Sequence, residues 1–308
     1  SALSPHTLHE RPFGTNFQNI YSIFEAAAAR RPSRPCFGTR FRADGSVGPF
    51  SWQTYEEVAA RVQAFAAGLW QLHVVPASAD GKRFVGLYMK NSPEWMVAAE
   101  ACYRTGVCIV PMYDTLGPET VSYIQGQTLA TTVICTAAEL PQLLKACPFS
   151  HVVVTGPIKP DLLAKAKSTK AFTLITFADL EKLGAANLAL LPSVPPPEPA
   201  DLAMLCYTSG TTGDPKGAML THGNILAAIA NASYPEWGLF TTDSAGPQEV
   251  HLSYLPLAHV FETVVINYCL FAGCAIGFYQ GDTLKIIEDL AALRPTTVLP
   301  SLPLCGTI

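Results

Sequence analysis

A run of hydroxyl residues and glycines, Thr208–Gly217, constrains this chain more than any other feature. It reads Thr-Ser-Gly-Thr-Thr-Gly-Asp-Pro-Lys-Gly. The apolar segment 201–206 before it predicts a buried strand, and 224–230 after it predicts a helix with Thr221 as a plausible cap. A strand, a small polar loop and a helix in this order present bare backbone N–H groups to an anion.

The side chains of the loop fit the phosphates of a nucleoside triphosphate. Its glycines let the backbone approach a ligand closely, and its hydroxyls add hydrogen-bond donors. Lys216 contributes a compact positive charge that suits phosphate oxygens. We therefore expect phosphate contacts from the following residues: Thr208, Ser209, Gly210, Thr211, Thr212, Gly213 and Lys216.

Spacing decides which kind of phosphate loop this is. Counted from Gly210, Pro215 stands where a Walker A loop needs glycine, and Gly217 stands where it needs serine or threonine. A dinucleotide fingerprint G-x-G-x-x-G is absent from the stretch as well. The stretch is therefore unlike the loop of P-loop NTPases. The alternative without a binding role is a surface loop that happens to be rich in threonine and glycine.

Composition excludes several classes of protein. With 49% hydrophobic and 14% charged residues in 308, the chain has enough apolar surface for a large core and is not disordered. Its net charge of −4 argues against nucleic-acid binding, which needs a basic surface. Nine scattered cysteines without a C-x-x-C pair favour free thiols in a reducing, intracellular compartment over a disulfide or zinc framework.

The order of elements predicts an α/β fold. From 84 to 183 short apolar runs alternate with helical patterns, which is typical of parallel-sheet layers covered by helices on both faces. A proline-rich segment, 191–200, predicts a stiff linker between a first α/β subdomain, 1–190, and a second, 201–308.

The segment 260–279 is apolar enough to suggest a membrane span, but it contains Glu262, Asn267 and two glycines. A buried helix followed by a strand from Ala275 is the better interpretation. The polar start of the chain carries no visible secretory signal. Peripheral association with a membrane stays open.

A second constellation, Leu255-Pro256-Leu257-Ala258-His259-Val260-Phe261-Glu262, ends a predicted strand and enters a predicted helix. In open parallel sheets ligands bind beyond the carboxyl ends of the strands, so His259 is expected at the same edge as the phosphate loop. From spacing alone, two interpretations of His259 are equally good: a functional histidine, or a core histidine whose hydrogen bonds are all made within the fold.

Together these stretches resemble adenylate-forming enzymes. The loop is similar to the family's phosphate loop, and Leu-Pro-Leu-Ala-His-x-x-Glu is similar to its second signature. Three further stretches, 91–95, 101–103 and 110–119, are similar to long-chain fatty acyl-CoA synthetases in particular. The last includes Tyr-Asp-Thr-Leu-Gly-Pro-Glu, and we interpret it as a family label, not as catalytic machinery.

The resemblance implies that a fatty acid carboxylate attacks ATP, giving acyl-AMP and pyrophosphate, and that coenzyme A then takes the acyl group. It implies catalytic roles for Lys216 and His259, and Thr208 as a ligand of Mg²⁺. It also implies an incomplete N-terminal domain of an acyl-CoA synthetase-like fold, so we expect the 308-residue piece alone to be inactive or nearly so.

Two alternatives stay open. One is a related enzyme that adenylates another carboxylic acid, and the other is a non-enzymatic adenylate-binding scaffold. The expected ligands are fatty acid, ATP and coenzyme A, without nucleic acid. The expected location is the cytoplasm or the cytosolic face of an organelle membrane, and oligomeric state is not predicted.

Overall fold

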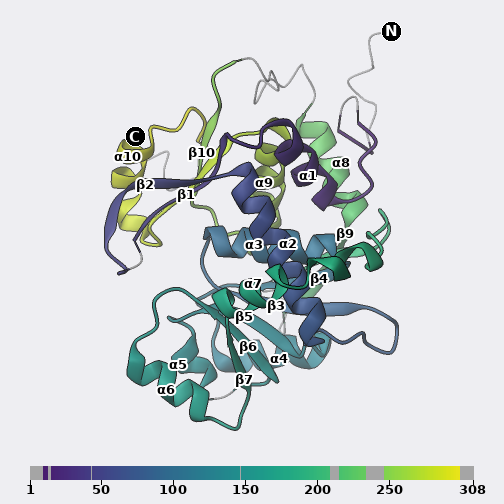
Figure 1. Cartoon of the computed structure of the whole chain (residues 1–308), viewed down its shortest axis with the longest axis vertical. Coiled ribbons are helices and arrows are strands. Elements are labelled where there is room, and N and C mark those ends of the chain that lie inside the picture. Colours follow the sequence, from purple (N-terminus) through teal and green to yellow (C-terminus); the bar gives the residue numbers. More distant parts are fainter. Residues whose placement is uncertain are drawn as a thin grey trace.

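The computed structural model describes residues 10–12, 15–42, 44–145, 147–208, 215–233 and 246–298. These form two sheets (Figure 1). One has, in spatial order, β7 (Thr173–Thr176), β6 (His151–Thr155), β5 (Thr132–Thr136), β3 (Arg83–Tyr88), β4 (Val107–Met112), β8 (Leu202–Thr208) and β9 (Lys216–Thr221). The other has β10 (Val250–Ser253), β11 (Ala275–Phe278), β1 (Pro35–Phe41) and β2 (Val47–Thr54). Only the edge pairs β8–β9 and β1–β2 are antiparallel among these strands.

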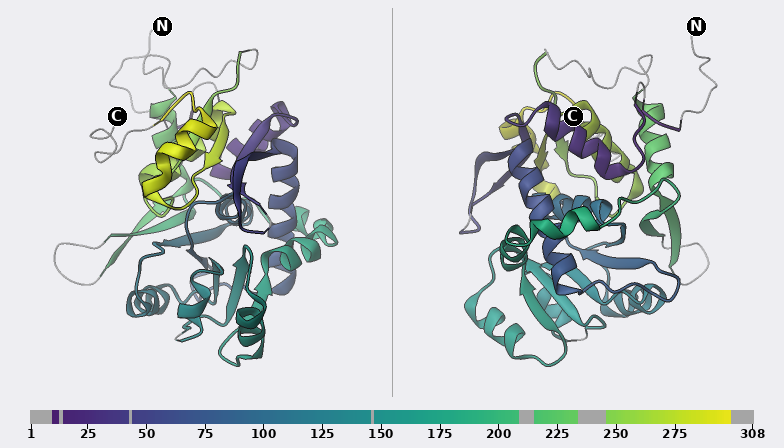
Figure 2. Two further views of the ribbon diagram at one scale, coloured as in Figure 1. Left: turned by 90° about the vertical axis from the view of Figure 1, so that its left-hand side faces the viewer. Right: turned by 45° about the vertical axis from the view of Figure 1, so that its right-hand side comes forward.

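Helices separate and cover the two sheets (Figures 1 and 2). The central helices, which pack between the sheets, are α1 (Ile20–Arg30), α2 (Tyr55–Leu72), α3 (Pro93–Arg104), α8 (His222–Ala232) and α9 (Val260–Ala272), with α7 (Phe177–Ala185) against α2. The outer helices are α4 (Pro118–Thr128), α5 (Leu140–Leu143) and α6 (Pro160–Ser168) on the seven-stranded sheet and α10 (Ile286–Leu293) on the four-stranded sheet. The predicted fold class, parallel-sheet layers with helices on both faces, is confirmed.

Alternation along the strands explains why helices cover both faces of the larger sheet. Ile134 and Val153 pack with the central helices, whereas Val133 and Val152 pack with the outer ones. Successive residues of a strand point to opposite faces, so a strand that is apolar at every position must be covered twice.

Capping residues determine where the helices begin. The Thr54 hydroxyl accepts a hydrogen bond from the Glu57 amide at 3.3 Å, and the Glu57 carboxylate accepts one from the Thr54 amide at 2.7 Å. This is a capping box at the start of α2. The first helix, α1, begins at Ile20 because the Asn19 side chain caps it.

The segment after the phosphate loop extends the sequence-based prediction by one strand. The helix predicted over 224–230 with Thr221 as its cap is confirmed, as α8, which begins at His222. What was not predicted is that 216–221, between the loop and this helix, forms β9, which pairs antiparallel with β8. Gly217 allows this pairing because a Cβ there would lie 3.0 Å from the Tyr207 ring. The loop therefore closes a hairpin, and α8 does not offer its N-terminus to an anion bound there.

Other elements differ less from expectation. Among the helices that alternate with strands from 84 to 183, α5 has only four residues. The apolar run 260–279 is a helix, α9, followed by the strand β11, as the sequence indicated. In the described ranges no helix has the length and apolar character needed to cross a bilayer. The eight cysteines in those ranges are free thiols.

The proline-rich segment is held against the body of the molecule. The carbonyl oxygens of Leu191 and Val194 accept hydrogen bonds from Arg104, and that of Pro197 accepts one from Asn19. Each sheet takes strands from both sides of this segment. The division into subdomains at 191–200 stays a prediction, and it differs from the division into sheets.

The Glu100 carboxyl is buried in the central helix layer without a hydrogen-bond partner among the described residues. The Glu100 side chain on α3 is 0% exposed, and both of its carboxyl oxygens lack a hydrogen-bond partner. Burial raises the pKa of this carboxyl well above its usual range, because the charged form loses its hydration. Glu100 is therefore a neutral acid in the folded protein at pH values where it ionises in the unfolded chain.

Glu100→Gln should make the protein more stable at neutral pH. The unfolded carboxyl loses its proton near pH 4.3 and the folded one does not, so wild-type stability falls as the pH rises through this interval. Each pH unit lowers the free energy of unfolding by about 1.4 kcal/mol until the pKa of Glu100 in the folded protein is reached. Urea unfolding at pH 5 and pH 8 should show the decline in wild type and in the exposed control Glu25→Gln, but not in Glu100→Gln. Equal declines in all three would contradict this account.

Candidate functional site

Two neighbouring strands of the larger sheet send their chains to opposite faces, which makes their carboxyl ends a topological switch point of the sheet. The chain after β3 enters the central helix α3, and the chain after β4 enters the outer helix α4. Such a switch point is where open α/β sheets bind ligands. The Lys90 ammonium lies 3.7 Å from the Asp114 carboxylate across it, and it donates to the Gly281 carbonyl at 2.8 Å. Because Gly281 follows β11, the smaller sheet meets the larger one at this edge.

The structure describes the two ends of the phosphate loop, and they lie at this same edge, on β8 and β9. Thr208 ends β8, Lys216 begins β9, and the two are paired across the hairpin. Both side chains are exposed. The other predicted loop contacts, Ser209, Gly210, Thr211, Thr212 and Gly213, lie outside the described residues.

His259 lies beside the end of β8. The Cys206 thiol donates to the Ala258 carbonyl at 3.7 Å, and Ala258 directly precedes His259. A strand rises about 3.3 Å per residue, so Thr208 is about 7 Å further along β8. The exposed His259 side chain caps α9, its Nδ1 accepting from the Phe261 amide at 3.2 Å. The fold thus brings together the start of the loop and the histidine, which are about 50 residues apart in the chain.

Burial raises the pKa of one thiol and two tyrosines at this edge. Burial raises the pKa of the Cys206 thiol, although a hydrogen bond from the Val260 amide opposes it. Burial, and secondly Cys206, raise the pKa of Tyr113. Burial followed by the negative charges of Asp114, Asp282 and Asp289 raises the pKa of Tyr279 to about 12. The tyrosines are hydroxyl groups here, so they add no negative charge that would repel a phosphate or a carboxylate.

A buried hydrogen-bond network beneath His259 was missed from the sequence. It consists of Asn91, Ser253, Leu255, Leu257 and Glu262. Asn91 lies in a stretch that was interpreted only as a family label. Its place directly after a strand of a parallel sheet could have indicated a role at the edge.

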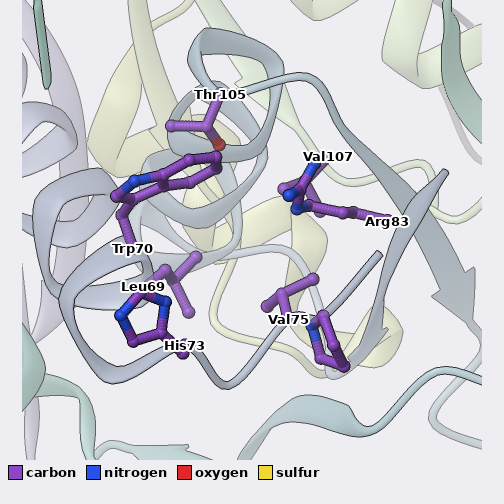
Figure 3. A pocket seen from close by; sticks show the side chains of 8 residues that line it. Leu69, Trp70, His73, Val75, Arg83, Thr105 and Val107 are labelled. Atoms are coloured by element: carbon purple, nitrogen blue, oxygen red, sulfur yellow. The ribbon is translucent and has the colours of Figure 1, made fainter. Parts of the chain in front are cut away.

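The opposite, amino-terminal edge of the same sheet carries a hollow of about 200 Å³ (Figure 3). Trp70 and His73, at the end of α2, line it together with Arg83 and Val107, which begin β3 and β4. The Arg83 guanidinium lies 5.0 Å from the centre of the Trp70 ring, a cation–π contact that stabilises this end of the fold. None of the predicted site residues lies in its lining, so the hollow is separate from the candidate site.

The chain belongs to the AMP-binding enzyme family, whose model matches residues 24–303. Among its relatives is long chain acyl-CoA synthetase 6, peroxisomal, from Arabidopsis thaliana, which is 37% identical over 98% of this chain and 42% of that protein. Long-chain-fatty-acid–CoA ligase 5 from Rattus norvegicus is 33% identical over 93% of this chain and 41% of that protein. The chain therefore spans less than half the length of these curated relatives.

Solved structures share the fold at lower identity. The A-PCP didomain of carboxylic acid reductase from Segniliparus rugosus, in complex with AMP, matches with a TM-score of 0.74 and 19% identity over 92% of this chain and 42% of that one. The anthranilate CoA ligase AuaEII, in complex with anthranoyl-AMP, matches with a TM-score of 0.72 and 19% identity over 92% of this chain and 49% of that one. At this identity the likeness establishes the fold alone.

Proposed function

We propose that this chain supplies the phosphate-binding and carboxylate-positioning part of an enzyme that activates a long-chain fatty acid with ATP. The observation that carries the proposal is the contact between Cys206 and Ala258, which holds the start of the phosphate loop beside His259. The names of the relatives support a long-chain fatty acid as the acyl substrate and coenzyme A as its final acceptor.

In the first step a carboxylate oxygen of the fatty acid attacks the α-phosphorus of ATP. The bond from that phosphorus to the bridging oxygen breaks, and acyl-AMP and pyrophosphate form. Displacement at phosphorus is mainly a problem of positioning and charge stabilisation. The loop donors from Thr208 to Gly213 and the Lys216 ammonium hold the β- and γ-phosphates and stabilise the negative charge that builds up on the leaving pyrophosphate.

His259 orients the reacting groups. Its Nδ1 accepts from the Phe261 amide, so in the neutral ring the proton is on Nε2, which is free to donate to a carboxylate or α-phosphate oxygen. In the second step the thiolate of coenzyme A attacks the acyl carbon, giving the thioester and releasing AMP.

Mg²⁺ fits only part of the described site. Thr208 offers a hydroxyl oxygen, the hard donor type that Mg²⁺ prefers beside phosphates. In the ranges that the structure describes, no cluster of three or more histidine, cysteine or acidic side chains could hold a metal ion. Thr208 would therefore bind the ion together with phosphate oxygens and water, and the bound ion would neutralise phosphate charge.

Pyrophosphate exchange tests the proposed function. Protein expressed from the complete reading frame that contains this chain should incorporate labelled pyrophosphate into ATP when palmitate is present. Benzoate and a medium-chain acid test the alternative of another carboxylic acid. Exchange with benzoate but not with palmitate would contradict the proposed substrate, and AMP binding without exchange with any acid would favour the scaffold.

Lys216→Ala should reduce the rate of pyrophosphate exchange on the order of 10²-fold, because the variant lacks one of the donors that stabilise the leaving pyrophosphate. The matched control is Lys167→Ala, which removes an exposed lysine from α6, far from the candidate edge. Steady-state exchange with saturating palmitate measures both. Equal rates for the two variants would exclude Lys216 from the site.

Thr208→Val should raise the Mg²⁺ concentration that gives half-maximal ATP binding, because valine has a similar shape but no oxygen donor. Thr173→Val, at an exposed position on β7, is the control and should leave the Mg²⁺ dependence unchanged. Titration calorimetry of ATP at a series of Mg²⁺ concentrations measures the effect. The same Mg²⁺ dependence in wild type and Thr208→Val would remove Thr208 from the metal site.

A further inference from the structure

Asn91 joins the two sheets directly beneath His259. It follows β3 at the carboxyl edge of the larger sheet, and it is 8% exposed. Its side-chain amide donates to the Ser253 hydroxyl at 2.9 Å and to the Leu255 carbonyl at 2.6 Å. Its side-chain oxygen accepts from the Leu257 amide at 2.9 Å. One side chain thus holds the segment that connects β10 of the smaller sheet to α9.

Among the described residues, no strand pairs with this segment. It runs from Tyr254 to His259, between the end of β10 and the start of α9, and contains Pro256. A backbone N–H or C=O group that is removed from water without a partner destabilises the fold, so the Leu257 amide and the Leu255 carbonyl need the bonds that Asn91 makes. Only an amide side chain donates twice and accepts once in this geometry; a carboxylate or an alkyl group does not.

The same segment is held from its other side by α9. The Ser253 hydroxyl, which accepts from Asn91, donates to the Glu262 carboxylate at 2.7 Å. Glu262 lies on the first turn of α9 and is 1% exposed. The Thr263 hydroxyl donates to the Leu257 carbonyl at 3.0 Å. His259 lies between these two attachments, so the position of its backbone follows from Asn91 on one side and from α9 on the other.

We propose that Asn91 is a positioning residue, which sets the placement of His259 relative to Thr208 and Lys216 by fixing 255–257. The inference rests on the proposed function, because it assigns Asn91 a part in the same reaction. Asn91 is attached to β3, and β8 lies two strands away in the same sheet. The amide therefore ties a segment of the smaller sheet to the sheet that carries Thr208 and Lys216. A shift of about 1 Å in such a contact can cost 10²-fold in rate.

A double-mutant cycle between Asn91 and His259 tests the proposal. In protein from the complete reading frame, Asn91→Ala should lower the maximal rate of pyrophosphate exchange 10- to 100-fold, with a smaller change in the KM for ATP. If Asn91 acts through His259, adding Asn91→Ala to His259→Ala should cost less than twofold further. The matched control is Asn19→Ala, which also removes a buried asparagine, 6% exposed, that bonds across the fold to Pro197. It should lower stability and leave the exchange rate unchanged.

The outcomes separate this proposal from the proposed function. Full additivity of the two substitutions would overturn a positioning role for Asn91, and so would an unchanged rate in either single variant. Hydrogen exchange on the same protein from the complete reading frame gives a second measurement that needs no activity. The Leu257 amide should lose its protection in Asn91→Ala and keep it in Asn19→Ala. If the wild-type protein lacks exchange activity but Asn91→Ala still removes the protection of the Leu257 amide, the proposed function is wrong and the attachment of 255–257 to Asn91 is correct. Unchanged protection of Leu257 would overturn the attachment itself.

Discussion

Because β3, β4 and β8 are parallel, the chain must leave all three at the same edge of the larger sheet. Lys90 and Asn91 follow β3, Asp114 follows β4, and Thr208 ends β8. Residues that are more than 100 positions apart in the chain thereby share one edge. This constraint on direction assembles the candidate site, and the side chains determine only which chemistry the edge can perform.

The central helix layer adds a second sheet to that edge. Its helices bury apolar side chains against both sheets, and the smaller sheet contributes His259 and the Gly281 carbonyl at the junction. Two polar contacts then fix the junction locally: Cys206 with Ala258, and Asn91 with 255–257. Burial supplies most of the stability of this arrangement, while the few polar contacts determine how the two sheets are placed relative to each other.

The sequence predicts much of this fold because its signals are local. Apolar runs mark the strands, and the caps at Thr54 and Ser92 place the starts of α2 and α3. The sequence does not predict the strand β9, which pairs with β8 on the other side of the phosphate loop. β9 is an exposed edge strand with little apolar patterning, and only its pairing with β8 defines it. The network around Asn91 is missed for a related reason. The bonds that Asn91 makes join residues more than 160 positions apart, and no local pattern reports such a contact.

A crystal structure with a non-hydrolysable acyl-AMP analogue tests the central claim most directly, because it locates the ligand without depending on turnover. We expect the adenylate phosphate at the carboxyl edge, between the paired residues Thr208 and Lys216 and His259. The hydrogen bonds from Asn91 to 255–257 should be the same as in the structure without the ligand. An adenylate bound instead in the hollow beside Trp70 and Arg83, at the opposite edge of the sheet, would contradict the central claim.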